Sequence, residues 1–370
     1  MTTETQPIRA GLIGYGYAGR TFHAPLLRCV PGLVLSVVGS TKPDVVNAAI
    51  PDAIVCSPDE VPTRDDLDLV VIATPNESHF PLAAAALRAG KHVVLDKPFT
   101  VTLAEARELV QIAEQHNRLL SVFHNRRWES EVLGTQAALQ SGALGRVTHY
   151  ECHMDRFRPN VRKRWREDPG PGAGLWFDLG PHLIDLALYL FGLPDTVNAS
   201  FATLRPGGQT EDWAHIQLGY KNSDDSDRLR VILNASLLVS GGGPRSVLHG
   251  TRASWAKYGI DPQEAQLVAG MLPTDPAFGI DPDPGILFDG ATGQRTEIPV
   301  PSGNQLGYYL GIRDAILASQ PAPIPAATAV AVMAILETTF KSGAEGRTLP
   351  VPLTAEERAH WTASGENNAR

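Results

Sequence analysis

The feature that most restricts the fold is a glycine-rich turn near the start of the chain. Ile8 to Ile13 is a short apolar run typical of a buried strand, and Gly14, Gly16 and Gly19 follow it at once in G-x-G-x-x-G spacing. In dinucleotide-binding folds such glycines permit a tight turn, close approach of the backbone to a pyrophosphate, and close packing of the next helix. A second strand-like run, Leu33 to Gly39, comes near the expected distance. The pattern therefore predicts a dinucleotide site rather than a structural turn.

Strands and helices alternate through the rest of the first half, which predicts a parallel sheet. Residues 1–126 are expected to form this domain, with Pro25 interrupting the helix after the glycine turn. The remaining expected strands are Ala53 to Cys56, Asp68 to Ala73, a strand ending at Lys97, and Leu119 to Phe123. The expected helices are Phe80 to Ala89, ended by Gly90, and Thr102 to His116, capped by Thr100 or Thr102.

The strand that ends at Lys97 places a lysine where chemistry is expected. Val93, Val94 and Leu95 are apolar and typical of a strand buried on both faces, and Pro98 cannot donate to a strand ladder. In an open parallel sheet the ligand crevice lies outside the carboxyl ends of the strands. Lys97 is therefore a candidate for function, and the alternative is a solvated lysine at a strand end.

The end of the second strand bears on which dinucleotide is bound. NAD-preferring folds usually carry Asp or Glu about 20 residues beyond the glycine turn, where the carboxylate accepts the ribose 2′-hydroxyl. Here that position reads Ser40, Thr41 and Lys42, and Pro43 is expected to turn Asp44 away. Two hydroxyls and an ammonium group suit a 2′-phosphate, so the sequence favours NADP, with NAD possible. The alternative is that Lys42 is a solvated loop lysine and both cofactors are accepted.

The candidate cofactor-binding residues lie at the glycine turn and at the ends of later strands. They are Gly14, Tyr15, Gly16, Tyr17, Ala18, Gly19, Ser40, Thr41, Lys42, Thr74, Pro75, Asn76, His79, Lys97, Pro98, Asn125 and Arg126.

Longer strand-like runs dominate the second half, residues 127–370, and predict an open, mostly antiparallel sheet in an α+β domain. These runs are Val147 to Asp155, Val197 to Leu204, Trp213 to Tyr220 and Leu229 to Leu238. A charged hairpin tip is expected at Asn222 to Asp227 and a loop at Pro273 to Gly285. Helices are expected at Tyr308 to Ser319 and Ala329 to Ser342, and they are candidates to pack back on the first domain.

One helix interrupts these strands and carries candidate catalytic groups. It runs from Gly174 to Phe191, before Gly192, and it places Asp178 and His182 four residues apart on one face. A carboxylate beside an imidazole fixes the tautomer of the ring and stabilises the imidazolium that forms when the ring accepts a proton. A histidine that acts as a general base requires both. Asp185 is a candidate for contact with His182 from the next turn. The alternative is a capping aspartate followed by a structural histidine.

A basic loop from Arg156 to Arg166 precedes this helix and holds six Lys or Arg residues. Arg158 and Trp165 are the candidates to contact a polar substrate. The alternative is a solvated loop or a loop that contacts another subunit.

Composition excludes several classes of protein. The net charge of −8 over 370 residues disfavours nucleic-acid and anionic-membrane binding, because both need a basic surface. No run approaches the roughly 20 apolar residues of a membrane span, and Met1 to Pro7 has no apolar signal core. We therefore expect a cytoplasmic protein. Three isolated cysteines and no H-E-x-x-H pattern favour neither a disulfide framework nor a metal site.

Three motifs together resemble the Gfo/Idh/MocA family of nicotinamide-dependent sugar and polyol oxidoreductases. They are G-Y-G-Y-A-G at 14–19, D-K-P at 96–98 and D-L-G-P-H at 178–182. The segments S-V-F-H-N-R-R-W, R-F-R-P and R-W-R-E, at 121–128, 156–159 and 164–167, look most like the NADP-dependent scyllo-inositol dehydrogenases. The family more often has Glu where this chain has Asp96.

The resemblance implies roles for these motifs. Lys97, Asp178 and His182 match the family's catalytic residues, and Lys97, Arg158, Trp165, Asp178 and His182 are the expected substrate contacts. It also implies a Rossmann domain plus an open sheet with one face used for subunit contact, hence a homodimer or homotetramer. The family often has a cis proline after the lysine.

We expect an enzyme that moves a hydride between nicotinamide and a ring carbon of a cyclic polyol or sugar, with scyllo-inositol or scyllo-inosose as the favoured substrate. His182 is the expected general base, Asp178 its partner, and Lys97 the group that stabilises alkoxide charge. The alternatives are oxidation of another sugar or glucoside, and a regulator that binds the dinucleotide without turnover.

Overall fold

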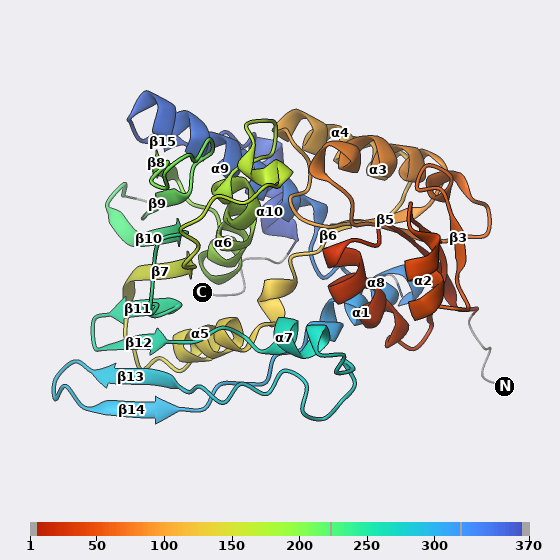
Figure 1. The fold of residues 1–370 in the computed structure, drawn as a ribbon. Coiled ribbons are helices and arrows are strands. Elements are labelled where there is room, and N and C mark those ends of the chain that lie inside the picture. The colour runs from red at the N-terminus through yellow and green to blue at the C-terminus, as the bar shows by residue number, and fades with distance from the viewer. Residues whose placement is uncertain (1–5, 223, 319, 365–370) are drawn as a thin grey trace. The chain divides into compact units, whose positions relative to one another are not determined.

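The computed structural model describes residues 6–222, 224–318 and 320–364 (Figure 1). The chain forms two units, and each is assembled from three stretches of sequence. The first unit is Met1–Asn125, Pro262–Phe278 and Asn304–Val330; the second is Arg126–Asp261, Gly279–Gly303 and Ala331–Arg370. The sequence places the boundary at residue 126 and makes the late helices candidates to pack back on the first domain. The first unit takes in two later stretches, and the second of them contains the helix expected from Tyr308.

A six-stranded parallel sheet forms the centre of the first unit, in the order β3-β2-β1-β4-β5-β6. Its strands are β1 (Ile8–Ile13), β2 (Leu33–Gly39), β3 (Ile54–Cys56), β4 (Leu69–Ile72), β5 (His92–Leu95) and β6 (Leu120–Val122). The strand order reverses between β1 and β4, and in such sheets the ligand crevice lies at this switch point, outside the carboxyl ends. The Rossmann-type fold expected from the glycine turn is confirmed.

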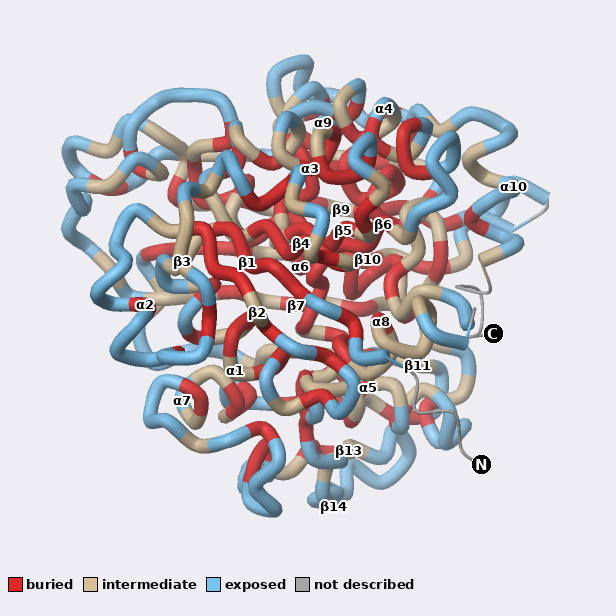
Figure 2. Tube along the Cα trace, turned by 90° about the vertical axis from the view of Figure 1, so that its right-hand side faces the viewer, coloured by how far each residue is buried: buried red, intermediate tan, exposed pale blue. Residues whose placement is uncertain are grey.

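The central strands of this sheet are buried on both faces, as their continuous apolar runs predict. All four residues of β4 are inaccessible to solvent, and so are Val93, Val94 and Leu95 of β5 (Figure 2). β5 ends at Leu95, two residues before the expected end at Lys97, because the Asp96 carboxylate turns back to accept the Lys97 backbone N–H at 2.9 Å. The Lys97–Pro98 peptide is cis, as the resemblance implied.

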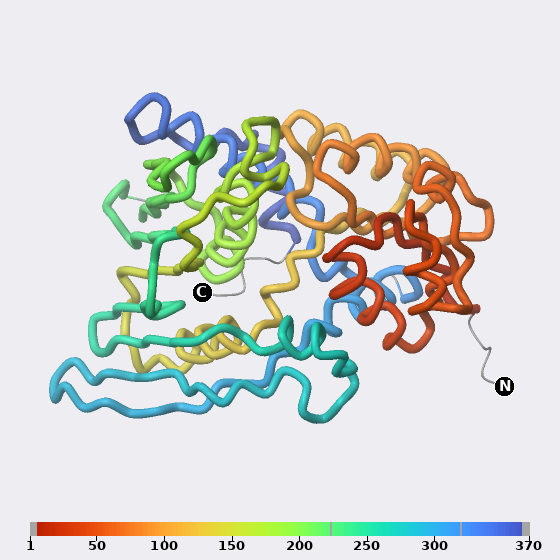
Figure 3. The backbone as a smooth tube through the Cα atoms, viewed as in Figure 1, coloured from red at the N-terminus to blue at the C-terminus, as the bar shows by residue number. Residues whose placement is uncertain are grey.

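Helices complete the first unit. They are α1 (Ala24–Arg28), α2 (Pro43–Ala49), α3 (His79–Arg88), α4 (Leu103–Gln115), α7 (Gln263–Val268) and α8 (Leu306–Ala318). The expected interruption near Pro25 is confirmed, since a π-helical turn, Gly19–His23, precedes α1. Thr102 caps α4 in a reciprocal capping box with Glu105. Figure 3 follows the chain as it returns late in the sequence to lay α8 against α1.

A nine-stranded mixed sheet forms the second unit, in the order β14-β13-β12-β11-β7-β10-β9-β8-β15. Its strands are β7 (Val147–Asp155), β8 (Thr196–Ala202), β9 (Trp213–Lys221), β10 (Asp227–Ser236), β11 (Ser246–Gly250), β12 (Ala253–Lys257), β13 (Gly285–Asp289), β14 (Arg295–Ile298) and β15 (Leu349–Pro350). The pairing is antiparallel except between β7 and β10. A parallel pair needs a long connection, and the segment with the basic loop and the next helix provides one after β7.

Helices cover one face of this sheet. They include α5 (Ser130–Gln140) and α6 (Leu175–Phe191). α9 (Ala326–Glu345) begins in the first unit and continues into the second, and α10 (Ala355–Ala363) follows it in the chain. α6 packs on β7, β9 and β10 (Figure 1). Residues of β7 alternate between the covered face, with Tyr150 and Cys152 buried, and the other face, with Glu151 and His153 half-buried. On β7 the second face is therefore polar, and the described part of this unit shows no helix over it (Figure 1).

Three expectations from the sequence include residues outside those that the structure describes: Ser319 of the expected helix Tyr308 to Ser319, Ser223 of the expected hairpin tip Asn222 to Asp227, and the first five residues of the chain. No helix among the described residues is both long and apolar enough to cross a membrane.

Candidate active site

The glycine turn after β1 has the geometry that a dinucleotide requires. Gly14 has φ +96°, and a side-chain carbon there would overlap the carbonyl of Ala73. A Cβ on Gly19 would overlap the carbonyl oxygen of Gly14, so this glycine allows the helical segment to pack closely on the turn. A Cβ on Gly16, in contrast, would meet nothing within 4 Å. The backbone at Gly16 therefore borders open space, as the close approach of a diphosphate requires.

The helical segment after the turn begins beside this space. It starts immediately after Gly16, whose carbonyl accepts the Arg20 N–H at 3.0 Å. Because the first N–H groups of a helix have no partner within the helix, those of residues near Tyr17 and Ala18 can bind phosphate oxygens. The Tyr17 side chain is more than half exposed, and its hydroxyl donates to Glu264 at 2.6 Å. Tyr15 is half-buried beside it.

The end of β2 carries no carboxylate at its tip. Ser40 is half-buried, Thr41 and Lys42 are exposed, and the Lys42 backbone N–H donates to Ser40 Oγ at 3.1 Å. α2 begins at Pro43, which places Asp44 in its first turn. The groups presented at this strand end are two hydroxyls and one ammonium, which suit a phosphate monoester.

His79 links the loops that follow β4 and β5. It is buried, with Nε2 3.0 Å from the Thr74 carbonyl oxygen and Nδ1 2.9 Å from the Pro98 carbonyl oxygen. Burial lowers the pKa of His79, and a neutral imidazole can donate to one of these two carbonyls at a time. His79 therefore faces backbone on both sides and fixes the relative position of two strand ends, while Pro75 and the buried Asn76 lie in the first of these loops.

A buried chain of polar groups lies next to Lys97. His23 is inaccessible to solvent, with Nδ1 2.6 Å from the Tyr309 hydroxyl and Nε2 3.8 Å from Asp96 Oδ1. Burial alone would raise the pKa of the Asp96 carboxyl. The contact with His23 and the charges of His23 and Lys97 lower it by more, so the net pKa lies below the ordinary value. Sequence reasoning missed His23 and Tyr309, because 286 residues separate them and no motif links them.

In the second unit, α6 carries the other candidate catalytic groups. Gly174, with φ +95°, begins the helix, and the buried, nearly all-apolar surface of α6 fixes it on the sheet. Asp178 and the buried His182 lie four residues apart and so share a face. Arg166 Nε is 3.5 Å from Asp178 Oδ1. An anionic aspartate one turn from an imidazole can orient it as a proton acceptor.

Asp185 has a different partner from the one expected. Both of its carboxylate oxygens accept from the Arg127 guanidinium, at 2.7 Å and 3.0 Å, and both side chains are buried. The guanidinium also lies over the Tyr189 ring, 4.7 Å from its centroid. These contacts indicate that the ion pair between Arg127 and Asp185 of α6 is structural.

The last two candidate cofactor residues fall on either side of the division between the units. Asn125 closes the first stretch of the first unit and is buried. Arg126 opens the second unit and forms an ion pair with Glu129 at 2.6 Å. Burial raises the pKa of Glu129 to about 7, against the lowering effect of Arg126.

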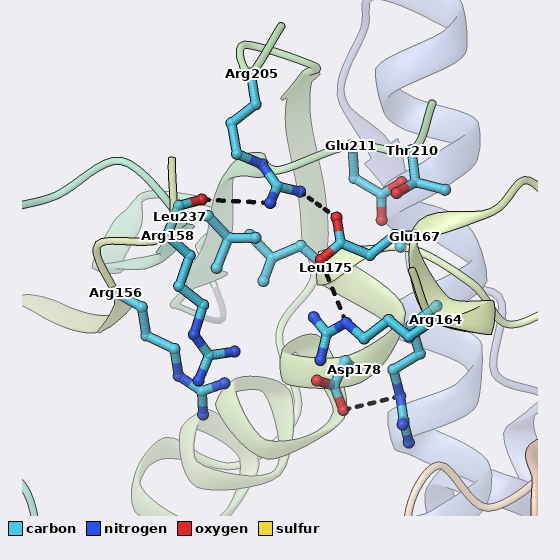
Figure 4. Close-up of a pocket in the computed structure, with 12 residues that line it drawn as sticks. Arg156, Arg158, Arg164, Glu167, Leu175, Asp178, Arg205, Thr210, Glu211 and Leu237 are labelled. Atoms are coloured by element: carbon cyan, nitrogen blue, oxygen red, sulfur yellow. Dashed lines mark hydrogen bonds and ion pairs between the residues drawn. The ribbon is translucent and has the colours of Figure 1, made fainter. Parts of the chain in front are cut away.

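A charged pocket lies at the start of α6 (Figure 4). It is lined by Arg156, Arg158, Arg164, Arg166, Glu167, Gly174, Leu175, Asp178, Arg205, Thr210, Glu211 and Leu237. Sequence reasoning selected Arg158 and Asp178 from this set. Trp165 is not among the described residues that line the pocket; Arg166 covers its ring at 4.5 Å.

The structure thus brings the candidate residues together in two groups. The first unit holds the glycine turn, the end of β2, the loop after β4, and Lys97 at the carboxyl edge of its sheet. The second unit holds Asp178 and His182 on α6 and the arginine-lined pocket. Arg205 and Glu211 were missed, since they belong to a loop with no recognisable motif.

Comparison with known proteins agrees with this architecture. Residues 8–124 match an oxidoreductase family with an NAD-binding Rossmann fold, and residues 132–256 match the GFO/IDH/MocA C-terminal domain. The chain is 47% identical over 346 residues to the uncharacterized oxidoreductase YdgJ of Escherichia coli, covering 92% of this chain and 98% of that protein. It is 35% identical over 351 residues to the scyllo-inositol 2-dehydrogenase (NADP(+)) IolW of Bacillus subtilis, covering 94% and 96%.

Solved structures show the same fold. A protein from Klebsiella pneumoniae superposes with a TM-score of 0.90 at 46% identity, covering 98% of this chain and 100% of that chain. An oxidoreductase from Bacillus cereus superposes with a TM-score of 0.84 at 27% identity, covering 94% and 99%.

Proposed function

Since the chain belongs to the Gfo/Idh/MocA family of NAD(P)-binding oxidoreductases, we propose that it is an NADP-dependent dehydrogenase of a ring carbinol in a cyclic polyol or sugar. The observation that carries the proposal is the placement of Lys97 at the carboxyl edge of the sheet that also carries the open glycine turn. An ammonium group at this edge can stabilise an oxygen that develops negative charge.

The nicotinamide dinucleotide, when bound, supplies the site that accepts or donates a hydride. In the proposal, Gly14, Gly16 and Gly19 with the following N–H groups hold its diphosphate, and Thr74 to Asn76 with Pro98 line its path along the sheet edge. Asn125 and Arg126 complete the candidate cofactor contacts. NADP is proposed over NAD because Ser40, Thr41 and Lys42 offer donors and no carboxylate at the end of β2.

In the proposal, residues of the chain itself accept and relay the proton. His182 takes the proton from the substrate hydroxyl, and Asp178 orients the imidazole or holds a neighbouring hydroxyl. Lys97 stabilises the alkoxide character of the reacting oxygen and relays the proton. This assignment requires Lys97 of the first unit and the α6 residues of the second to act on one substrate.

We propose scyllo-inositol or its ketone, scyllo-inosose, as the substrate, because IolW carries that activity in its name. Another sugar or glucoside oxidised at one ring carbon is the second candidate. The polar sheet face that includes Glu151 and His153 is the proposed subunit contact of a homodimer or homotetramer, and we propose a cytoplasmic location.

A turnover screen tests the proposal. Inositols, their ketones and common sugars are assayed with NADP and NAD in both directions. Turnover of an inositol with NADP is expected, and the rate should follow a deprotonation in the range of a histidine pKa, about 6 to 7. Lys97→Ala and His182→Ala should each lower kcat by about a hundredfold or more while leaving dinucleotide affinity intact. Dinucleotide binding with no turnover of any polyol would instead favour a regulator.

A further inference from the structure

The basic loop starts with two arginines held on the same side of an extended segment. Arg156 and Arg158 donate their backbone N–H groups to the Ser236 and Leu237 carbonyls at 2.8 Å and 2.7 Å, so the chain stays extended beyond β7. Side chains two residues apart on an extended chain point to one face. Both arginines line the pocket and run in the same direction in Figure 4, whereas Phe157 between them is more than half exposed.

Two carboxylates, Glu167 in the pocket lining and Asp212 outside it, are paired with Arg164 and Arg205. Glu167 accepts from Arg205 at 2.7 Å and from Arg164 at 3.2 Å. Arg205 also pairs with Asp212 at 2.9 Å, behind the pocket lining. These short contacts neutralise Glu167 and Asp212 with Arg205 and Arg164 and leave them little capacity to offset a further cation.

The remaining charge at the pocket is positive. Apart from the paired Arg164, Arg205 and Glu167, three arginines line the pocket, Arg156, Arg158 and Arg166, against two carboxylates, Asp178 and Glu211. The Arg158 guanidinium forms no ion pair with a carboxylate of the described residues. Burial, and then the charges of Arg162 and Arg164, lower the pKa of Arg158, which shows that its surroundings disfavour a cation.

We propose that this pocket binds an oxyanion substituent of the substrate, a carboxylate or a phosphate, with Arg158 as the principal ligand and Arg156 beside it. The planar guanidinium fits both groups, donating two parallel hydrogen bonds to two of their oxygens. A neutral hydroxyl can accept from the same donors but does not offset their charge. Since Asp178 lines the same pocket, the anionic group lies near the end of α6 that carries the proposed chemistry.

This inference rests on the proposed function and narrows it. The enzyme turns over neutral ring polyols and sugars, scyllo-inositol included, and it prefers derivatives of these compounds that carry a negative group. The arginines then select the substrate, and the α6 residues act on its carbinol.

The test compares matched neutral and anionic substrates in the full-length protein. The pairs are an inositol with its monophosphate, glucose with glucuronate, and glucose with glucose 6-phosphate. The anionic member of at least one pair should show kcat/KM about tenfold or more above the neutral member. The uronate separates carboxylate recognition from phosphate recognition.

Two variants link the preference to the pocket. Arg158→Gln should lower kcat/KM for the anionic substrate by about ten- to a hundredfold more than for its neutral partner. Lys163→Gln removes the same charge from an exposed position of the same loop, outside the pocket lining, and should change neither value. Inorganic phosphate should compete with the substrate in the unmodified protein and more weakly in Arg158→Gln.

The outcomes separate the two proposals. Neutral and anionic substrates used equally well, with equal losses in Arg158→Gln, would overturn the oxyanion pocket and leave the dehydrogenase standing. Phosphate binding that depends on Arg158, with no turnover of any polyol or sugar, would support the pocket and overturn the proposed reaction. An equal effect of Lys163→Gln would mean that loop charge, rather than the pocket, causes the preference.

Discussion

Replacing the second glycine of the turn by alanine should separate cofactor binding from folding. A Cβ on Gly16 meets nothing within 4 Å in the protein alone, so Gly16→Ala requires no rearrangement. Its effect on stability should be a gain of about 0.4 to 1 kcal/mol at most, through the reduced freedom of the unfolded chain. The added methyl group occupies the space through which a diphosphate must approach the backbone. Loss of one charge-assisted hydrogen bond to phosphate costs about 1.5 to 3 kcal/mol, or roughly 10- to 150-fold in Kd.

Gly19→Ala is the matched control, because the same added methyl group has the opposite consequence. Its Cβ would lie much closer than 3.0 Å to the Gly14 carbonyl oxygen, and real Cβ atoms essentially never approach another heavy atom so closely. The helical segment must move away from the turn, and overpacking of this kind typically costs about 1 to 3 kcal/mol.

The assay measures two quantities for each variant: the Kd for NADPH by fluorescence titration and the free energy of unfolding in urea. Gly16→Ala should keep the stability and lose the affinity, and Gly19→Ala should lose stability. A Gly16→Ala protein that binds NADPH with unchanged Kd would show that the diphosphate does not approach this residue. Unchanged stability in Gly19→Ala would refute the packing role assigned to the third glycine.

Three further outcomes are expected. NADP should be preferred over NAD by about tenfold or more in kcat/KM, and Lys42→Ala should raise KM for NADP selectively; parallel changes in both constants would contradict a phosphate contact. Asp185→Asn should lower the free energy of unfolding by about 3 to 5 kcal/mol, because it removes the carboxylate charge that pairs with the buried Arg127; a changed pH–rate profile at unchanged stability would instead place Asp185 in catalysis. Burial lowers the pKa of His92 to about 4 from an ordinary 6.5, and protonation would remove the acceptor of the Leu119 N–H. The unfolded state binds this proton at a higher pH than the folded state, so the free energy of unfolding should rise as the pH increases from about 4 to 6.5. An NMR titration of His92 in the folded protein centred near 6.5 would contradict this.

Local signals in the sequence predicted much of the first unit. The glycine spacing placed the turn after β1, and Thr102, one of two candidate caps, begins α4. In the second unit, Gly174 and Gly192 bounded α6. Each is a short-range rule, in which a residue type satisfies a backbone requirement of its immediate neighbours. The position of Lys97 at the sheet edge followed from the same reasoning.

The features that sequence reasoning missed depend on distant partners. The parallel pairing of β7 with β10, the strands β11 to β14, and the helix α5 carry weak local patterns and are fixed by packing on other elements. The same holds for the network of Arg205 with Glu167 and Asp212, in which 38 residues separate Arg205 from Glu167. The sequence did contain one signal for the pocket. Arg156 and Arg158 stand two residues apart, so on an extended chain their side chains lie on the same face.

The return of α8 to the first unit has a consequence for how the protein is made. The Tyr308 hydroxyl donates to Ser121 Oγ at 3.0 Å, and Ser121 Oγ donates to the Ile324 carbonyl at 2.9 Å, in the interior beside β6. During synthesis at about 5 to 20 residues per second, the first six strands leave the ribosome well before these partners exist. Until residues 304–330 emerge, the apolar surface that Tyr308, Tyr309 and Ile312 cover stays open to water or to a chaperone. Most of the dinucleotide-binding unit is therefore translated first. Its fold cannot be completed, however, until nearly the whole chain has been made.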